Sequence, residues 1–427
     1  MHQFKSFSEV HSSWKENTGN ALLFDRDGVL SSMTYDALSD AVARRAETLR
    51  SETDDFVLDP VRADHTPETI IRIFADVMAG RDVLLIEDKI PADLLSFVTE
   101  EAKKLPDTGE EGHLFFFTSG TTSRSRVVTL TSRSLTASAW SGQCMLPCGP
   151  GDTILSILPL SHVFGFVCSM LWGLAYGAAI ALGRGVRTIM EDCLYFDPTI
   201  LPAVPTIVEA LHRFRLFNPS LKTVLIGAAP CSEELTKALQ KDGKKVYLGY
   251  GLTETSSGIA ITQDQDDPYG LFPCPGADIR IEEEGEVSVA TPCMMEGYLG
   301  EPDVLRNGRF YTGDLGHFDS KGRLRLEGRK KDILVLSDGT KVFCPEYESE
   351  LAGVIGTKEL AVAQKAGRPV LVISGEVDRG YVQDVVDHFN QLRQRSRQLT
   401  QVIYVSEPLP RTAIGKLKRW ELQQMIQ

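Results

Sequence analysis

Residues 114–126 read Leu-Phe-Phe-Phe-Thr-Ser-Gly-Thr-Thr-Ser-Arg-Ser-Arg, so an apolar run passes directly into a loop of hydroxyl side chains. The apolar part predicts a buried strand. In the loop, hydroxyls can donate hydrogen bonds, Gly120 lets the backbone approach an anion closely, and Arg124 and Arg126 add fixed positive charge. This pattern indicates a phosphate-binding loop, although a Ser/Thr-rich segment is also an ordinary turn.

The composition limits the classes of protein that the chain can represent. With 427 residues, 42% of them hydrophobic, the chain can bury a substantial core and form two or more domains. Its net charge of −13 and the lack of a long basic block disfavour nucleic acid or an anionic membrane as the main partner. The eight cysteines include no Cys-x-x-Cys pair, which favours a reducing, cytoplasmic compartment, and the first residues are too polar for a signal peptide.

One uncharged segment, residues 163–182, has to be tested as a membrane span because it contains Gly173-x-x-x-Gly177. Four glycines interrupt it. The pattern favours a buried helix ending near Tyr176, followed by a short buried strand over 178–182. We therefore expect core here and no integral membrane segment.

Apolar runs alternate with amphipathic stretches over the first 250 residues, which predicts α/β layers with mostly parallel sheets. After about residue 270 the pattern changes to short strands and turns, which indicates a small β-rich subdomain over 271–331. A further α+β unit begins at residue 332. The predicted strands are 82–86, 114–118, 153–158, 178–182, 223–226, 245–247, 278–282, 285–290, 322–327, 370–374 and 401–405, and the predicted helices include 232–241 and 380–394.

Four more motifs follow the hydroxyl loop in the sequence. Gly249-Tyr250-Gly251-Leu252-Thr253-Glu254 places a carboxylate after a strand and a glycine turn, where open α/β sheets hold ligands. Tyr311-Thr312-Gly313-Asp314 offers a carboxylate that can accept hydrogen bonds from paired hydroxyls. Gly328-Arg329-Lys330-Lys331-Asp332 is a basic turn, and the loop 409–416 presents Lys416. Each motif alone is a common surface turn, so their order and spacing carry the argument.

Taken together, these five motifs resemble the adenylate-forming superfamily of acyl-CoA ligases, luciferases and nonribosomal-peptide adenylation domains, over roughly residues 110–420. The sequence of the basic turn and of the residues that follow it most resembles that of the fatty-acyl ligases. The resemblance implies a large N-terminal domain (1–331) and a small mobile C-terminal domain (332–427), with Asp332 as the hinge. It also implies that ATP and Mg²⁺ activate a carboxylic acid as an acyl-adenylate, which then passes to a thiol.

The resemblance assigns a role to each motif. Glu254 would coordinate Mg²⁺, Thr253 would touch the α-phosphate, and Lys416 would bridge the α-phosphate and the acid. Tyr250 would stack on adenine, while Asp314 and Arg329 would bind the ribose hydroxyls. His162, in Pro159-Leu160-Ser161-His162, would line the acid pocket, although it could also be a core histidine. The phosphates would meet Thr118, Ser119, Gly120, Thr121 (also a metal ligand), Thr122 and Arg126, and the nucleotide would also meet Gly227, Ala228, Ala229 and Gly251.

Two departures from the family pattern leave alternatives open. Ser123-Arg124-Ser125-Arg126 replaces a more flexible glycine-, proline- and lysine-containing loop, so arginine would have to supply the charge. Residues 359–376 contain a loop that is short for one that holds a CoA nucleotide. CoA is the expected acceptor of a fatty or aromatic acyl group, the phosphopantetheine of an acyl carrier protein is the alternative, and a non-catalytic nucleotide-binding relative is the third.

Overall fold

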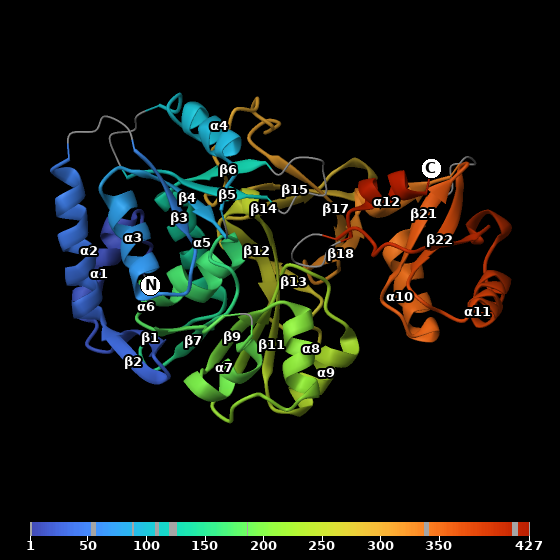
Figure 1. Cartoon of the computed structure of the whole chain (residues 1–427), viewed down its shortest axis with the longest axis horizontal. Coiled ribbons are helices and arrows are strands. Elements are labelled where there is room, and N and C mark those ends of the chain that lie inside the picture. Colours follow the sequence, from blue (N-terminus) through green and yellow to red (C-terminus); the bar gives the residue numbers. More distant parts are fainter. Residues whose placement is uncertain are drawn as a thin grey trace.

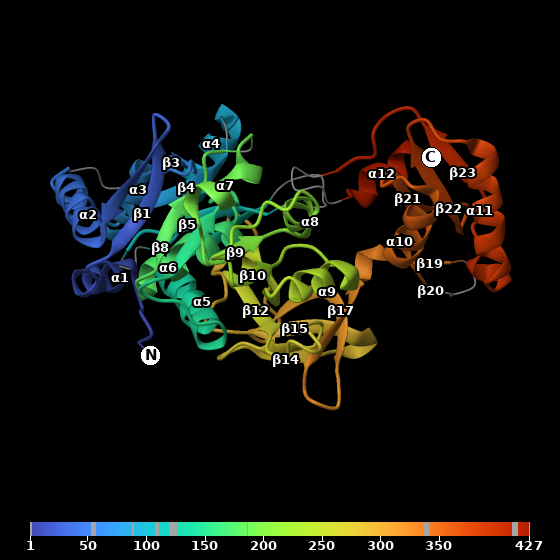
Figure 2. The same cartoon turned by 90° about the horizontal axis from the view of Figure 1, so that it is seen from below.

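The computed structural model describes residues 2–52, 57–87, 89–106, 111–118, 126–185, 187–336, 341–411 and 417–426. Within these ranges the chain is built from layered sheets and helices, and the elements from β19 (Ile333–Val335) onward form a separate body at one end of the molecule (Figures 1 and 2). The predicted α/β architecture with two domains is confirmed.

The largest sheet joins a parallel centre to an antiparallel wing. β8, β7, β9, β10 and β11 pair in parallel, and β11 then continues antiparallel through β12 into the wing. In spatial order its strands are β14 (Asp278–Ile281), β15 (Glu286–Ala290), β17 (Phe310–Phe318), β18 (Leu324–Arg329), β13 (Leu271–Pro273), β12 (Ser257–Thr262), β11 (Lys245–Leu252), β10 (Thr223–Ile226), β9 (Ile200–Ala203), β7 (Thr153–Ser156), β8 (Ala179–Leu182), β1 (Asn20–Arg26) and β2 (Val29–Thr34).

A second, five-stranded sheet carries the hydroxyl loop. β3, β4 and β5 are parallel, whereas β6 and β16 add antiparallel to β5. The order is β16 (Gly297–Tyr298), β6 (Val127–Leu130), β5 (Leu114–Phe117), β4 (Asp82–Ile86) and β3 (Leu58–Arg62). The loop of residues 119–125, which connects β5 and β6, lies outside the described residues.

Helices cover both sheets of the large domain, and α5 packs against the main sheet at β12 (Figure 1). α5 begins behind Thr131, because the Thr131 side chain accepts from the Ser134 N–H while the Ser134 hydroxyl accepts from the Thr131 N–H. The helices are α1 (Phe7–Ser13), α2 (Tyr35–Arg50), α3 (Pro67–Met78), α4 (Ala92–Ala102), α5 (Ser132–Met145), α6 (Trp172–Tyr176), α7 (Ile189–Phe196), α8 (Pro205–Arg213) and α9 (Glu233–Lys241), with short 3₁₀ turns at Trp14–Glu16, Thr253–Thr255 (η3) and Glu283–Gly285.

The uncharged segment 163–182 folds as η2 (Phe164–Leu171), α6 and β8, all packed in the core. η2 winds as a π-helix, a rare form that occurs frequently at functional sites. The helix ends at Tyr176 as predicted, and Gly177 closes it with a left-handed φ of +86°. Across the described residues, no helix is both long enough and apolar enough to cross a bilayer.

The C-terminal part has its own hydrophobic clusters, drawn from residues 334–426. Its three-stranded sheet has the order β21, β22, β23, and β19 pairs with β20. The elements are the 3₁₀ turn η5 (Lys330–Asp332), β19 (Ile333–Val335), β20 (Lys341–Phe343), α10 (Cys344–Ile355), β21 (Leu360–Lys365), β22 (Arg368–Ser374), α11 (Arg379–Gln391), a 3₁₀ turn at Arg395–Arg397, β23 (Val402–Val405) and α12 (Arg419–Met425).

Candidate active site

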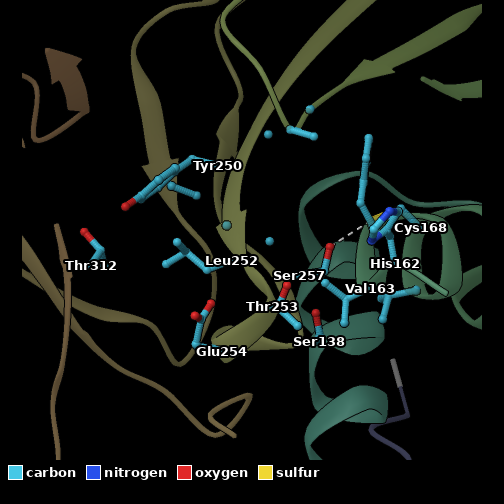
Figure 3. Close-up of a pocket in the computed structure, with 18 of the residues that line it drawn as sticks. Ser138, His162, Val163, Cys168, Tyr250, Leu252, Thr253, Glu254, Ser257 and Thr312 are labelled. Carbon is cyan, nitrogen blue, oxygen red and sulfur yellow. Dashed lines mark hydrogen bonds between the residues drawn. The ribbon is translucent and has the colours of Figure 1, made fainter. Parts of the chain in front are cut away.

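One cavity of about 450 Å³ lies beyond the carboxyl ends of β5, β7, β10 and β11, at the junction with α5, η2 and the antiparallel wing. Ligands of open α/β sheets bind at such strand ends, and the volume falls within the ordinary range of ligand pockets. Figure 3 shows two ends of the cavity: Tyr250 and Thr312 lie at one, His162, Cys168 and Ser257 lie at the other, and Glu254 lies between them.

The first end is organised around the carboxylate of Asp314, which is 6% exposed. Tyr250 Oη donates to Asp314 Oδ2 over 2.8 Å, and Arg329 Nε donates to Asp314 Oδ1 over 2.9 Å. Asp314 and Arg329 face each other because they are register partners in β17 and β18. Burial, together with the charge of Asp314, raises the pKa of Tyr250 well above its usual value, so the phenol stays a neutral donor.

A glycine turn directly precedes Asp314, at the wall of the cavity that Thr312 and Gly313 line. Gly313 has a φ of +72°, which favours glycine, and its N–H donates to Glu286 Oε1 over 3.2 Å. The Thr312 hydroxyl accepts from the Asp314 N–H over 3.1 Å and donates to the carbonyl of Val287. The Thr-Gly-Asp motif is therefore fixed on the neighbouring strand β15.

Glu254 stands between the two ends of the cavity, in the short η3 turn that follows β11. Tyr298 Oη donates to Glu254 Oε1 over 2.5 Å, and the guanidinium of Arg126 lies 4.5 Å from the centre of the Tyr298 ring. Burial, reinforced by Glu254, raises the pKa of Tyr298, which keeps its proton on the phenol. Tyr298 is a site residue that the sequence did not single out, because nothing links it to Glu254 except the folded chain.

Arg126 and Thr118 close the base of the hydroxyl loop. The Thr118 N–H donates to the carbonyl of Arg126 over 2.9 Å, and the Arg126 N–H donates to Thr118 Oγ1 over 3.2 Å. Both residues line the cavity, so the loop leaves and re-enters the fold at the site. The predicted phosphate ligands Ser119, Gly120, Thr121 and Thr122, and the predicted catalytic Lys416, lie outside the described residues.

His162 is at the second end of the cavity, where the chain enters η2. Its Nε2 lies 3.1 Å from Glu87 Oε1, which also accepts the hydroxyl of Ser161. Beside it, Cys168 Sγ and Ser257 Oγ are hydrogen bonded over 3.4 Å (Figure 3). Neither Cys168 nor Ser257 belongs to a recognisable motif, and they are 89 positions apart in the sequence.

The small residues after β10 and in β11 make room at the cavity. A Cβ on Gly227 would lie 3.0 Å from the Phe164 ring, and one on Gly251 would lie 1.7 Å from the carbonyl oxygen of Ser257. Gly227, Ala228, Gly251 and Thr253 line the cavity, whereas the predicted Ala229 is exposed beside them.

Asp332, the predicted hinge, lies at the start of the C-terminal body rather than in the cavity. Its carboxylate pairs with Arg419 of α12, and the Arg419 guanidinium also forms two 2.9 Å hydrogen bonds with the carboxylate of Glu348 in α10. The residue at the predicted hinge is thus tied to the helix that follows the loop of Lys416.

The cavity thus has a polar end around Tyr250 and Arg329, the carboxylate of Glu254 in the middle and an uncharged end around Cys168 and Ser257. Comparisons with known proteins give the class of enzyme. Residues 102–299 match the family described as AMP-binding enzyme. A 2-succinylbenzoate–CoA ligase of Bacillus cereus is 30% identical over 354 residues, which cover 74% of this chain and 71% of that protein.

Solved structures show the same fold. The o-succinylbenzoate CoA synthetase of Bacillus subtilis, in complex with its acyl-adenylate intermediate, superposes with a TM-score of 0.82 at 21% identity and covers 99% of this chain and 98% of that one. That synthetase is also known in complex with ATP and magnesium ion. An anthranilate CoA ligase bound to anthranoyl-AMP has a TM-score of 0.82 at 17% identity, over 100% and 98% of the two chains.

The chain belongs to the AMP-binding enzyme family. The predicted superfamily and the predicted enzyme class, an AMP-forming acid–thiol ligase, are confirmed. The alternative of a non-catalytic nucleotide-binding relative is therefore not pursued.

Proposed function

We propose that this enzyme uses ATP and Mg²⁺ to activate a small carboxylic acid and then transfers the acyl group to CoA. One observation carries the proposal: Tyr250 and Arg329, which both hold the carboxylate of Asp314, line the same cavity as an uncharged pocket, with Glu254 between them. Such a cavity can hold an acid carboxylate against the α-phosphate of a nucleotide, which is the arrangement that an in-line transfer requires.

The chemistry of the first step explains why these residue types are needed. An acid carboxylate oxygen attacks the α-phosphorus, an acyl–O–P bond forms, and the bond to pyrophosphate breaks. Because nucleophile and phosphate are both anionic, catalysis depends on positioning and charge neutralisation. Asp314, held by Arg329 and Tyr250, would accept hydrogen bonds from the ribose hydroxyls. Arg126 would supply positive charge near the phosphates.

Glu254 fits the predicted role of magnesium ligand. Mg²⁺ in such sites usually takes one or two protein carboxylates together with substrate phosphates, and it then neutralises phosphate charge. The hydrogen bond from Tyr298 fixes the orientation of the Glu254 carboxylate. The roles proposed for three other residues are unchanged. Thr253 would contact the α-phosphate, Tyr250 would stack on adenine, and His162 would line the acid pocket.

CoA is the acceptor that the comparisons support, because the matched relatives are named as CoA ligases. Loading of a carrier protein has no such support. The proposed compartment is the cytoplasm, in keeping with eight cysteines, all among the described residues, that form no disulfide. We also propose that the domains divide at residues 331 and 332, with Asp332 as hinge, since the hydrophobic clusters separate there.

Acid-dependent exchange of labelled pyrophosphate into ATP tests the activation step. The purified protein is given ATP, Mg²⁺ and a panel of acids, and exchange is expected with at least one acid. CoA and a phosphopantetheinylated carrier protein are then offered separately. Thioester on CoA supports the proposal, and thioester on the carrier alone would overturn the choice of acceptor.

A further inference from the structure

The cations that line the cavity, among the described residues, are gathered at one end. Among the described lining residues the cations are Arg126, Arg329 and Lys331. Arg329 is paired with Asp314, and Lys331 is two positions further along the same turn. Arg126 pairs with Glu301 and covers the Tyr298 ring. All three therefore belong to the nucleotide end.

The opposite end, which we call the acyl pocket, is lined by uncharged side chains of three elements. They are Ser138, Ala139 and Gly142 of α5, Val167 and Cys168 of η2, and Ser257, Gly258, Ala260 and Ile261 of β12. Its polar groups Cys168 and Ser257 are bonded to each other, and burial raises the pKa of Cys168 to about 11, which keeps the thiol neutral. Figure 3 shows Ser138, Cys168 and Ser257 of this set close together at the same end of the cavity.

Among the residues that the structure describes, the titratable neighbours of the acyl pocket do not provide a countercharge for an anion. His162 borders the acyl pocket, and the group facing it is the carboxylate of Glu87, 3.1 Å away. A ligand anion at this place would meet the negative charge of Glu87 together with the histidine. A carboxylate taken out of water without a paired cation is strongly disfavoured.

The size of the cavity also limits which acyl groups can bind. The whole cavity of about 450 Å³ must hold part of a nucleotide as well as the acyl group. The bulky side chains of Trp172 and Leu146 also line the cavity. The pocket therefore suits a compact ring or a short branched tail better than a long alkyl chain.

We propose that the substrate is a monocarboxylic acid with a compact, uncharged tail, aromatic or alicyclic, and that a second carboxylate on the tail is excluded. This inference rests on the proposed function. It separates the chain from its relatives named for 2-succinylbenzoate, a dicarboxylic acid, because membership of the family does not fix the charge of the tail.

Two matched acyl-sulfamoyl adenosines test the tail preference without requiring catalysis. One carries a 4-oxo-4-phenylbutanoyl group, and the other carries the same group with a carboxylate at the ortho position of the ring. Calorimetric titration of the full-length protein is expected to show at least tenfold tighter binding of the uncharged analogue. Equal or tighter binding of the carboxylated analogue would overturn the proposal.

A charge introduced into the acyl pocket tests the location. Cys168→Lys is expected to reduce the tenfold preference or reverse it, whereas Cys168→Met, of similar length and uncharged, should keep it. Ser138→Lys places the cation on the opposite wall and serves if the first variant does not fold. An unchanged preference in a folded lysine variant would contradict the assignment of the acyl pocket.

The free acids of the two analogues separate this inference from the proposed function. Pyrophosphate exchange with 4-oxo-4-phenylbutanoate and not with 2-succinylbenzoate supports both. If no acid of the panel supports exchange while the analogue preference holds, the proposed activation step is wrong and the tail preference stands. Exchange with 2-succinylbenzoate at equal efficiency would overturn the inference alone.

Discussion

At the scale of single residues, the site depends on Asp314, whose two carboxylate oxygens are oriented from two strands. Tyr250 contacts one oxygen and Arg329 the other. Sequence motifs identified all three residues and predicted a role for each. Only the folded structure shows that the three residues form one hydrogen-bonded cluster, because Tyr250 and Asp314 are 64 positions apart in the sequence.

Asp314→Asn tests this cluster. A hydrogen bond to a charged group is worth roughly 1.5–3 kcal/mol, so the KM for ATP should rise about 10- to 100-fold, with a smaller effect on the KM for the acid. Steady-state kinetics with each substrate varied in turn measures both. Glu327→Gln, an exposed change on the strand of Arg329, is the matched control. An unaltered KM for ATP would contradict the role in ribose binding.

Lys416→Ala should lower acyl-adenylate formation by at least about 100-fold and leave ATP affinity within about threefold, because a compact charge is lost where negative charge builds up in the transition state. Single-turnover adenylation and calorimetric ATP binding measure the two quantities. Lys418→Ala, which removes a surface pair with Glu421, is the control. Adenylation at wild-type speed in Lys416→Ala would refute the catalytic role.

At the scale of elements, the β11–β12 hairpin connects the two ends of the cavity: β11 carries Tyr250 and β12 carries Ser257. Gly251 and Gly258 are register partners in it, but their surroundings differ. A Cβ on Gly251 would lie 1.7 Å from the Ser257 carbonyl oxygen, whereas a Cβ on Gly258 would meet nothing within 4 Å. The close approach of the two strands therefore requires glycine only at position 251.

Gly251→Ala is expected to destabilise the protein by more than about 2 kcal/mol, because backbone atoms must move apart to admit the methyl group. Gly258→Ala, directly across the hairpin, should change stability by less than about 1 kcal/mol. Thermal unfolding of the two variants provides the comparison. Equal melting temperatures would show that the hairpin can relax and that the close approach is not a constraint.

A second element-scale feature is His113 at the start of β5, between the carboxylates of Asp82 and Glu296. Their oxygens lie 3.0 and 3.3 Å from its two ring nitrogens. Burial alone would lower the pKa of His113, but hydrogen bonds and charges from Asp82 and Glu296 outweigh it and raise the pKa to about 9. The protonated histidine thus links β4, β5 and the segment before β16.

The raised pKa makes stability depend on pH. The contribution of His113 is fully present below its unfolded pKa of 6.5 and is lost as pH rises towards 9. Between these values the wild type should lose up to about 3 kcal/mol more unfolding free energy than His113→Gln. Denaturant unfolding at pH 6.5 and 9 measures this, with His317→Gln on an exposed hairpin as control. The same pH dependence in the wild type and His113→Gln would contradict it.

At the scale of the whole molecule, the C-terminal body has separate hydrophobic clusters and joins the large domain through η5. Gly328, just before the turn, has a φ of +137°, and a Cβ there would lie 2.1 Å from the ring of Phe343. The two bodies thus touch closely beside Arg329. A rotation about the proposed hinge at Asp332 would change this contact.

Asp332→Pro tests the proposed hinge by restricting its backbone. Acyl-adenylate formation should stay within a few-fold of the wild type, while thioester formation should fall by at least about tenfold, because the second step needs the other domain orientation. Rapid-quench measurement of each half-reaction separates them. Asp332→Ala also removes the ion pair with Arg419 but leaves rotation free, so it should retain both steps. Equal losses in the two half-reactions would contradict a hinge.

Much of the fold followed from local pattern. The strands β4 and β10 have the predicted bounds, and the predicted helix 232–241 is α9 with Ser232 as its N-cap. The predicted end of β11 at residue 247 is wrong. The strand continues to Leu252 because antiparallel pairing with β12 holds the extension. Strand propensity in a glycine-rich segment is weak, so only the distant partner could extend it.

The sequence by itself determined the chemistry of this enzyme, because carboxylates, hydroxyls and cations in a fixed order specify what can be bound and neutralised. Only the tertiary structure decided which of them meet. The contacts of Tyr298 with Glu254 and of Cys168 with Ser257 join residues 44 and 89 positions apart. The separation of a charged nucleotide end from an uncharged acyl pocket arises in the same way, since neighbours across packed elements leave no periodic signal along the chain.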